Sequence, residues 1–198
     1  MRTFPLAALI IITLYALSGC TAAVVGGAVV GTSVALDKRT TGDYVEDQSI
    51  KSKLSHLYYE DKELSKTTHI NITSYNRWVL ITGEVATEQQ KQQLTEMINK
   101  VKNVRNYFNE VAIANVSSMG TRTNDSFLTS KIKTAIFTKM EELDGAQVKV
   151  VTENSSVFLM GLVTPEQGNQ ITEIARTTRG VKRVIKLFEY QDPNDKRI

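Results

Sequence analysis

The sequence predicts an α+β protein made of two tandem α-β-β-α-β modules, each with two helices packed on a three-stranded mixed sheet. Two observations predict this fold. Residues 47 to about 114 align with residues 125 to about 190 at a nearly constant offset. Within each copy, apolar residues recur first at helical spacing, then alternate along two strands, and return to helical spacing before a last strand. A repeated order of elements indicates a repeated fold.

The repeat can be followed residue by residue. Apolar positions, turn residues and a single glycine coincide at one offset through the first half of the module, and a one-residue deletion adjusts the offset in the second half. The aligned pairs include Ile50 with Leu128, Leu54 with Ile132, Ile70 with Val148, Asn76 with Asn154, Gly83 with Gly161, and Leu94 with Ile171. So many coincidences indicate two copies of one structure.

A short apolar segment precedes the repeat. The run from Leu6 to Leu17 has the length of a secretory signal and is short for a membrane span. It ends in Leu17-Ser18-Gly19-Cys20, which resembles a bacterial lipobox. We predict a lipoprotein signal peptide at 1–19, with Cys20 as the acylated first residue of the mature chain; the alternative is an uncleaved anchor with an incidental Cys20. Several acyl chains give permanent residence on a bilayer.

The segment from 20 to 43 is predicted to be the lipidated N-terminus and a tether. Its small residues, Val24-Val25-Gly26-Gly27-Ala28 among them, lack a clear periodicity. This composition is typical of a flexible tether, and the alternative is a short helix that packs on a neighbour. Amphipathic segments begin only after it.

Each copy is predicted to begin with a helix and a hairpin. The helices are predicted from the apolar stripes Ile50, Leu54 and Leu57 in the first copy and Leu128, Ile132, Ala135 and Ile136 in the second. The hairpins are predicted from residues that alternate around Ser74-Tyr75-Asn76 and Glu153-Asn154-Ser155. A period of two residues places one face of each hairpin on a core.

A second helix and a last strand complete each copy. The second helix is predicted to open at Thr87 in the first copy and at Thr164-Pro165 in the second. The last strands are predicted over 104–113 and 181–190. We therefore place the two modules at 44–114 and 125–190, joined by a linker at 115–124 that is rich in Ser, Thr, Gly and Asn, and followed by a C-terminal tail at 191–198.

The two tandem units, each with one glycine near the end of its second strand, resemble BON domains. The runs Val148–Asn154, Val157–Thr164 and Gly180–Val184 are similar to the lipoproteins of this family that carry two BON domains. The resemblance implies a periplasmic protein of the outer membrane that recognises anionic phospholipid through its second module and supports envelope integrity and cell division. The family's site lies on the first helix of that module, where an exposed large aromatic falls on Phe127.

The same helix carries a candidate lipid-binding surface by residue pattern alone. Leu128 and Ile132 fall on one side of it, whereas Phe127 and Phe137 fall roughly opposite, bordered by lysines. Aromatic rings beside ammonium groups are typical of a surface that contacts lipid headgroups. The predicted phospholipid-binding residues are Phe127, Leu128, Ser130, Lys131, Lys133, Thr134 and Phe137. The alternative is that the two phenylalanines pack on the first module.

The residue inventory argues against catalysis, and we predict no enzyme activity, cofactor or metal. The chain has two histidines, His56 and His69, and one cysteine. No second His or Cys lies near His69, so we expect a surface or half-buried strand residue there and not a ligand. The formal charge of +3, from 24 basic and 21 acidic side chains, is too balanced for a nucleic-acid footprint.

Two further features allow alternatives. The acidic pairs Glu60-Asp61 and Glu141-Glu142 are predicted to be solubilising residues in loops. Tyr75 and Trp78, near the first hairpin turn, are expected to pack at a sheet edge, with a partner-binding patch as the alternative.

Two functions follow from the sequence. The first is a non-enzymatic lipoprotein on the periplasmic face of the outer membrane that binds anionic phospholipid through its second module. The second is a periplasmic interaction scaffold, in which the paired modules or the Trp78 surface bind envelope or division proteins and only the acyl anchor touches lipid.

Overall fold

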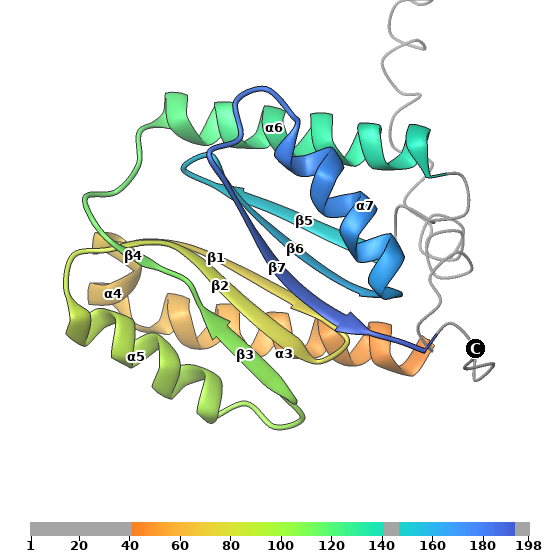
Figure 1. Cartoon of the computed structure of the whole chain (residues 1–198). Coiled ribbons are helices and arrows are strands. Elements are labelled where there is room, and N and C mark those ends of the chain that lie inside the picture. Colours follow the sequence, from red (N-terminus) through yellow and green to blue (C-terminus); the bar gives the residue numbers. More distant parts are fainter. Residues whose placement is uncertain (1–40, 141–146, 193–198) are drawn as a thin grey trace, which may run out of the picture. The chain divides into compact units, whose positions relative to one another are not determined.

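The computed structural model describes residues 41–140 and 147–192 (Figure 1). The first module consists of α3 (Thr41–Glu60), α4 (Lys62–Thr67), β1 (His69–Tyr75), β2 (Trp78–Val85), α5 (Glu88–Asn99), β3 (Asn106–Asn109) and β4 (Ala112–Ile113). The second consists of α6 (Met119–Lys139), β5 (Val148–Glu153), β6 (Ser156–Val163), α7 (Pro165–Arg176) and β7 (Arg183–Tyr190). The predicted α+β fold of two repeated modules is confirmed, with α4 as an added turn of helix.

Both sheets are mixed, for the same reason. In each module two strands form an antiparallel hairpin, β1 with β2 and β5 with β6. The strand that follows the second helix pairs in parallel with the central strand, β3 and β4 with β2, and β7 with β6. A chain that crosses over through a helix returns in the same direction, which gives the parallel pair.

The hairpin turns explain part of the repeat. The central residues of both turns have a positive φ, between 49° and 63°. They are Asn76 and Arg77 in the first turn, and Asn154 and Ser155 in the second. Two consecutive residues of this kind form the tight turn whose twist matches that of the flanking strands. Asparagine tolerates this conformation better than most residues, so its recurrence at the first turn position follows from backbone geometry.

Several element bounds differ from the sequence prediction. Helix α3 begins at Thr41, inside the predicted tether, and α6 begins at Met119, inside the predicted linker. The side chain of Ser118 accepts a hydrogen bond from the Thr121 amide and so starts α6 early. Asp61, predicted to be a loop acid, caps α4 by accepting a hydrogen bond from the Leu64 amide at 3.0 Å. The polar residues at the starts of these helices were assigned to a tether, a linker or a loop because their composition is typical of such segments.

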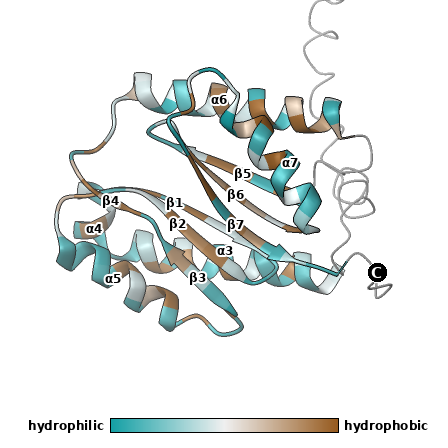
Figure 2. Ribbon diagram, in the orientation of Figure 1, coloured by the Kyte–Doolittle hydropathy of each residue, from teal (hydrophilic) through white to brown (hydrophobic). Residues whose placement is uncertain are grey.

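The helices of each module cover one face of its sheet. Ile50 and Leu54 of α3 join Leu94 and Ile98 of α5 over Val79 and other strand residues in one buried cluster. The matching cluster of the second module holds Ile132 and Ile136 of α6, Ile171 of α7 and Phe188 of β7. Figure 2 shows the apolar colouring concentrated in the strands and the polar colouring on α5 and α7.

The other faces of the two sheets pack against each other. A third buried cluster combines residues of both modules: Tyr75, Leu80, Phe158, Met160 and Leu187, with Trp78, Phe108, Val151, Leu162 and Ile185 against it. Polar contacts surround this cluster, since Arg105 binds Glu189 at 2.9 Å and Asn71 donates to Glu153 at 2.9 Å.

The aromatic residues Tyr75 and Trp78 therefore do not form a free patch. Tyr75 is buried, and the Trp78 ring lies 5.6 Å from the Phe108 ring inside the contact between the sheets. The expectation that these residues are packed is confirmed, although they pack between two sheets and not only at the edge of one. The alternative of a free partner-binding patch is wrong. The sequence analysis placed only one face of each hairpin on a core, so it gave no reason to expect a second sheet on the other face.

Among the described residues, no helix is long and apolar enough to cross a membrane. The predicted signal peptide at 1–19, Cys20, the tether as far as residue 40, the pair Glu141-Glu142 and residues 193–198 lie outside the described residues.

A candidate lipid-binding surface on α6

Helix α6 presents its two phenylalanines to solvent. The exposed fractions of Phe127 and Phe137 are 65% and 67%. The opposite side of the helix carries Leu128, Ile132 and Ile136, all buried in the second module. The alternative that Phe127 and Phe137 pack on the first module is therefore wrong.

One of the predicted site residues does not reach this surface. Leu128 is only 2% exposed, because it belongs to the buried stripe of α6. The remaining predicted residues, Phe127, Ser130, Lys131, Lys133, Thr134 and Phe137, are all exposed. We call these six residues the α6 strip.

An exposed methionine extends the strip toward the start of the helix. Met119 is 73% exposed, and at about 100° per residue it lies at the same helical angle as Phe137 and about 20° from that of Ser130. The sequence prediction missed it because residues 115–124 were assigned to a linker. The signal that could have found it is Ser118, a good N-cap residue directly before Met119.

The charge of α6 differs from that of the equivalent helix in the first module. Helix α6 contains Arg122, Lys131, Lys133 and Lys139 against one acid, the buried Asp125, which gives a net charge of 4 − 1 = +3. Helix α3 contains two lysines against four acids, which gives 2 − 4 = −2. The position of Phe127 is occupied by Ser49 in α3. Of these two helices, α6 is therefore the one that combines exposed aromatic rings with a positive charge.

A buried carboxylate attaches α6 to the hairpin of its own module. Asp125 is 3% exposed, and its two carboxylate oxygens accept hydrogen bonds from the amides of Asn154 and Ser155, both at 2.8 Å. Asp47 makes the same contacts in the first module, with the amides of Asn76 and Arg77 at 2.8 Å. These bonds fix the helix relative to the turn, and the sequence prediction gave neither aspartate a role.

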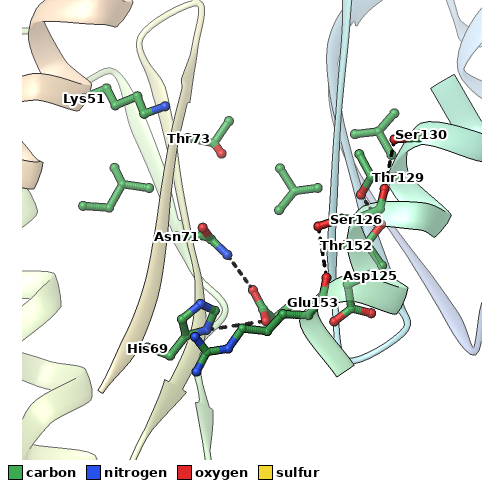
Figure 3. A pocket seen from close by; sticks show the side chains of 14 residues that line it. Lys51, His69, Asn71, Thr73, Asp125, Ser126, Thr129, Ser130, Thr152 and Glu153 are labelled. Carbon is green, nitrogen blue, oxygen red and sulfur yellow. Dashed lines mark hydrogen bonds and ion pairs between the residues drawn. The ribbon is translucent and has the colours of Figure 1, made fainter. Parts of the chain in front are cut away.

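A polar cavity of about 510 Å³ lies beside the start of α6 (Figure 3). Lys51, Asn71 and Thr73 of the first module line one side, and Ser126, Thr129 and Ser130 of α6 line the other. At its floor, Asn71 donates a hydrogen bond to Glu153. Burial raises the pKa of Glu153, and the neighbouring Glu84 carboxylate raises it further, although the Asn71 hydrogen bond and His69 act in the opposite direction.

His69 lies at this floor, at the start of β1, and its side chain is 20% exposed. The expectation of a half-buried strand residue is confirmed. The sequence reasoning considered only His and Cys as neighbours, whereas Glu84 and Glu153, whose carboxylates can also act as ligands, approach its ring. These residues are distant in the sequence, so no local pattern could have grouped them.

The comparisons with known proteins point to one family. The BON domain model matches residues 46–115 and 124–192. The chain is 36% identical over 176 residues to the outer membrane lipoprotein DolP of Haemophilus influenzae. The aligned region covers 89% of this chain and 91% of that protein. It is 30% identical over 155 residues to a 21 kDa hemolysin of Actinobacillus pleuropneumoniae, and this alignment covers 78% of this chain and 79% of the hemolysin.

A solved structure also aligns with much of the chain. It is CdsD, a structural protein of the type III secretion system of Chlamydia trachomatis, which is 11% identical and covers 71% of this chain and 91% of its own. The TM-score of 0.27 is too low to indicate a common arrangement of the modules.

Proposed function

Because the chain belongs to the BON-domain family, with two BON domains and a similarity to an outer membrane lipoprotein, we propose that it is a non-enzymatic lipoprotein of the outer membrane that binds anionic phospholipid through α6. Acylated Cys20 anchors it on the periplasmic face. By concentrating the protein on anionic regions of the membrane, α6 supports envelope integrity.

The observation that carries the proposal is the composition of the α6 strip. Its two phenylalanines are about two-thirds exposed, and lysines border them without an exposed acid on the same helix. Large apolar side chains exposed in this way mark an interaction surface. Exposed aromatic rings with flanking ammonium groups match a bilayer interface, where the rings enter the headgroup region and the charges meet anionic lipid.

Helix α6 by itself binds only weakly. A basic residue close to an anionic surface contributes about 1 kcal/mol. Lys131 and Lys133 therefore contribute about 2 kcal/mol together, a value that falls as salt screens the charges. The acyl anchor supplies residence on the membrane, and α6 supplies the preference among lipids.

The proposal is tested with residues 36–198, which keep all of α3 and lack the predicted anchor. We expect this chain to sediment with phosphatidylglycerol vesicles and not with phosphatidylcholine vesicles. Phe127→Glu should weaken the binding at least about tenfold, since it removes an inserted ring and adds a charge of the same sign as the lipid.

The first module offers a matched control. Tyr59 of α3 is 61% exposed, close to the value for Phe127, so Tyr59→Glu introduces the same charge at an equally exposed aromatic position. We expect Tyr59→Glu to change vesicle binding little. Equal losses in both variants would indicate nonspecific charge effects. Failure of the unsubstituted chain to bind either vesicle would leave the acyl anchor as the only lipid contact and favour the interaction scaffold.

A further inference from the structure

Three potential metal ligands meet where the two modules contact each other. His69 begins β1, Glu84 lies opposite it in β2, and Glu153 ends β5. The Nδ1 atom of His69 lies 3.3 Å from Oε2 of Glu84 and 3.8 Å from Oε1 of Glu153. One ligand atom from each residue can be chosen so that all three lie within 4.8 Å of one another. Figure 3 shows His69 and Glu153 converging on the floor of the cavity.

The two carboxylates are buried with little compensating charge. The side chains of Glu84 and Glu153 are 5% and 7% exposed. In the part of the chain that the structure describes, His69 is the only basic side chain within 4.0 Å of either one. Arg122 lines the same cavity, but its guanidinium group donates to Ser117. The hydrogen bonds that these carboxylates accept come from neutral groups: the side chains of Asn71 and Thr82 for Glu153, and the backbone amide of Ser117 for Glu84. Buried charges normally pair with an opposite charge or coordinate a metal ion.

The histidine nitrogen that faces these carboxylates also lacks a hydrogen-bond partner. Nδ1 of His69 is inaccessible to solvent, and no described atom forms a hydrogen bond with it. Buried polar atoms are rarely left in this state, and a bound ion is one recognised explanation. The absence of a hydrogen bond at this nitrogen is thus an observation separate from the burial of the two acids.

We propose that His69, Glu84 and Glu153 bind a divalent first-row transition metal ion, with Zn²⁺ as the probe. One imidazole nitrogen and two carboxylate oxygens are a ligand set that Zn²⁺ accepts, whereas Mg²⁺ and Ca²⁺ prefer oxygen ligands alone. Two ligand atoms about 2.1 Å from a tetrahedral ion are about 3.4 Å apart. The 3.3 Å between His69 and Glu84 is close to this value, and the 3.8 Å between His69 and Glu153 is about 0.4 Å longer. Water from the cavity completes the coordination.

The site would join the two modules. His69 and Glu84 come from the first sheet and Glu153 from the second, so an ion bound to all three connects β1, β2 and β5. An ion that binds only the folded chain stabilises it by mass action. The inference concerns the contact between the sheets and does not depend on lipid binding by α6.

The test is a calorimetric titration of the untagged full-length chain in detergent with Zn²⁺ and, separately, Mg²⁺. The chain carries Cys20→Ser, so that its thiol cannot bind Zn²⁺. We expect one Zn²⁺ per chain, a higher unfolding temperature with Zn²⁺ present, and no response to Mg²⁺. His69→Ala and Glu153→Gln should each lower the affinity for Zn²⁺ at least about tenfold.

The other histidine is the matched control. His56 is exposed and lies 3.2 Å from Glu60 on one face of α3, so it offers an imidazole and a carboxylate outside the proposed site. We expect His56→Ala to bind Zn²⁺ as tightly as the parent chain. The proposal is overturned if the parent takes up no Zn²⁺, if both site variants keep its affinity, or if His56→Ala loses as much. Glu153→Gln keeps the side-chain volume and remains informative if His69→Ala fails to fold.

Discussion

Gly83→Ala is expected to lower the free energy of unfolding by at least about 3 kcal/mol. Gly83 lies in β2 with φ of +123°, a conformation that residues with a side chain rarely adopt. A methyl group there would overlap the carbonyl oxygen of His69 on the neighbouring strand. Both the positive φ and the close approach of the two strands therefore require glycine. Chemical denaturation followed by circular dichroism measures the loss.

A glycine at an open position is the control. A methyl group at Gly120, in the first turn of α6, would lie 3.6 Å from the nearest atom, the Ser118 hydroxyl oxygen. Gly120→Ala should therefore leave the stability unchanged or raise it by about half a kcal/mol. If Gly83→Ala were as stable as Gly120→Ala, the strain inferred at Gly83 would be wrong.

Asp125→Ala is expected to lower the free energy of unfolding by about 3 kcal/mol. The substitution removes two hydrogen bonds from a charged acceptor to the hairpin amides of Asn154 and Ser155. It also leaves a small cavity below α6. Asp125→Asn keeps the volume but only one accepting oxygen, so about half of the loss is expected. Urea denaturation of the three proteins gives the comparison.

Asp61→Ala is the control for Asp125→Ala, because it also removes an aspartate but leaves the bonds between α6 and its hairpin intact. Asp61 accepts a single backbone hydrogen bond at the start of α4, and removing such a cap costs about 1 kcal/mol. Equal losses for Asp61→Ala and Asp125→Ala would contradict a structural role of the bonds between α6 and its hairpin.

Features encoded within a few neighbouring residues were predictable. The hairpin turns at Asn76 and Asn154 follow from residues that accept positive φ, and Thr87 and Thr164 mark the start of α5 and α7 as their N-caps. The exposure of Phe127 and Phe137 also follows from helical periodicity. Leu128 was included among the surface residues although its helical position places it on the buried stripe. The predicted periodicity was right, and only the choice of this residue was wrong.

Features that join distant segments were not predictable from one sequence. The bonds of Asp125 to the hairpin connect residues 29 and 30 positions apart, and the hydrogen bond from Asn71 to Glu153 spans 82 positions. Neither separation leaves a periodic signal. The packing of Tyr75 and Trp78 likewise depends on the second module, which the local pattern around them does not contain.

The contact between the two sheets bears on why the module occurs twice. A single α-β-β-α-β unit hides one sheet face beneath its helices and leaves the other, with Leu80 in one copy or Phe158 in the other, open to water. Such a surface would make a lone unit prone to self-association. Duplication within one chain covers each face with its counterpart at a very high local concentration, so neither apolar sheet face depends on a second molecule for its burial.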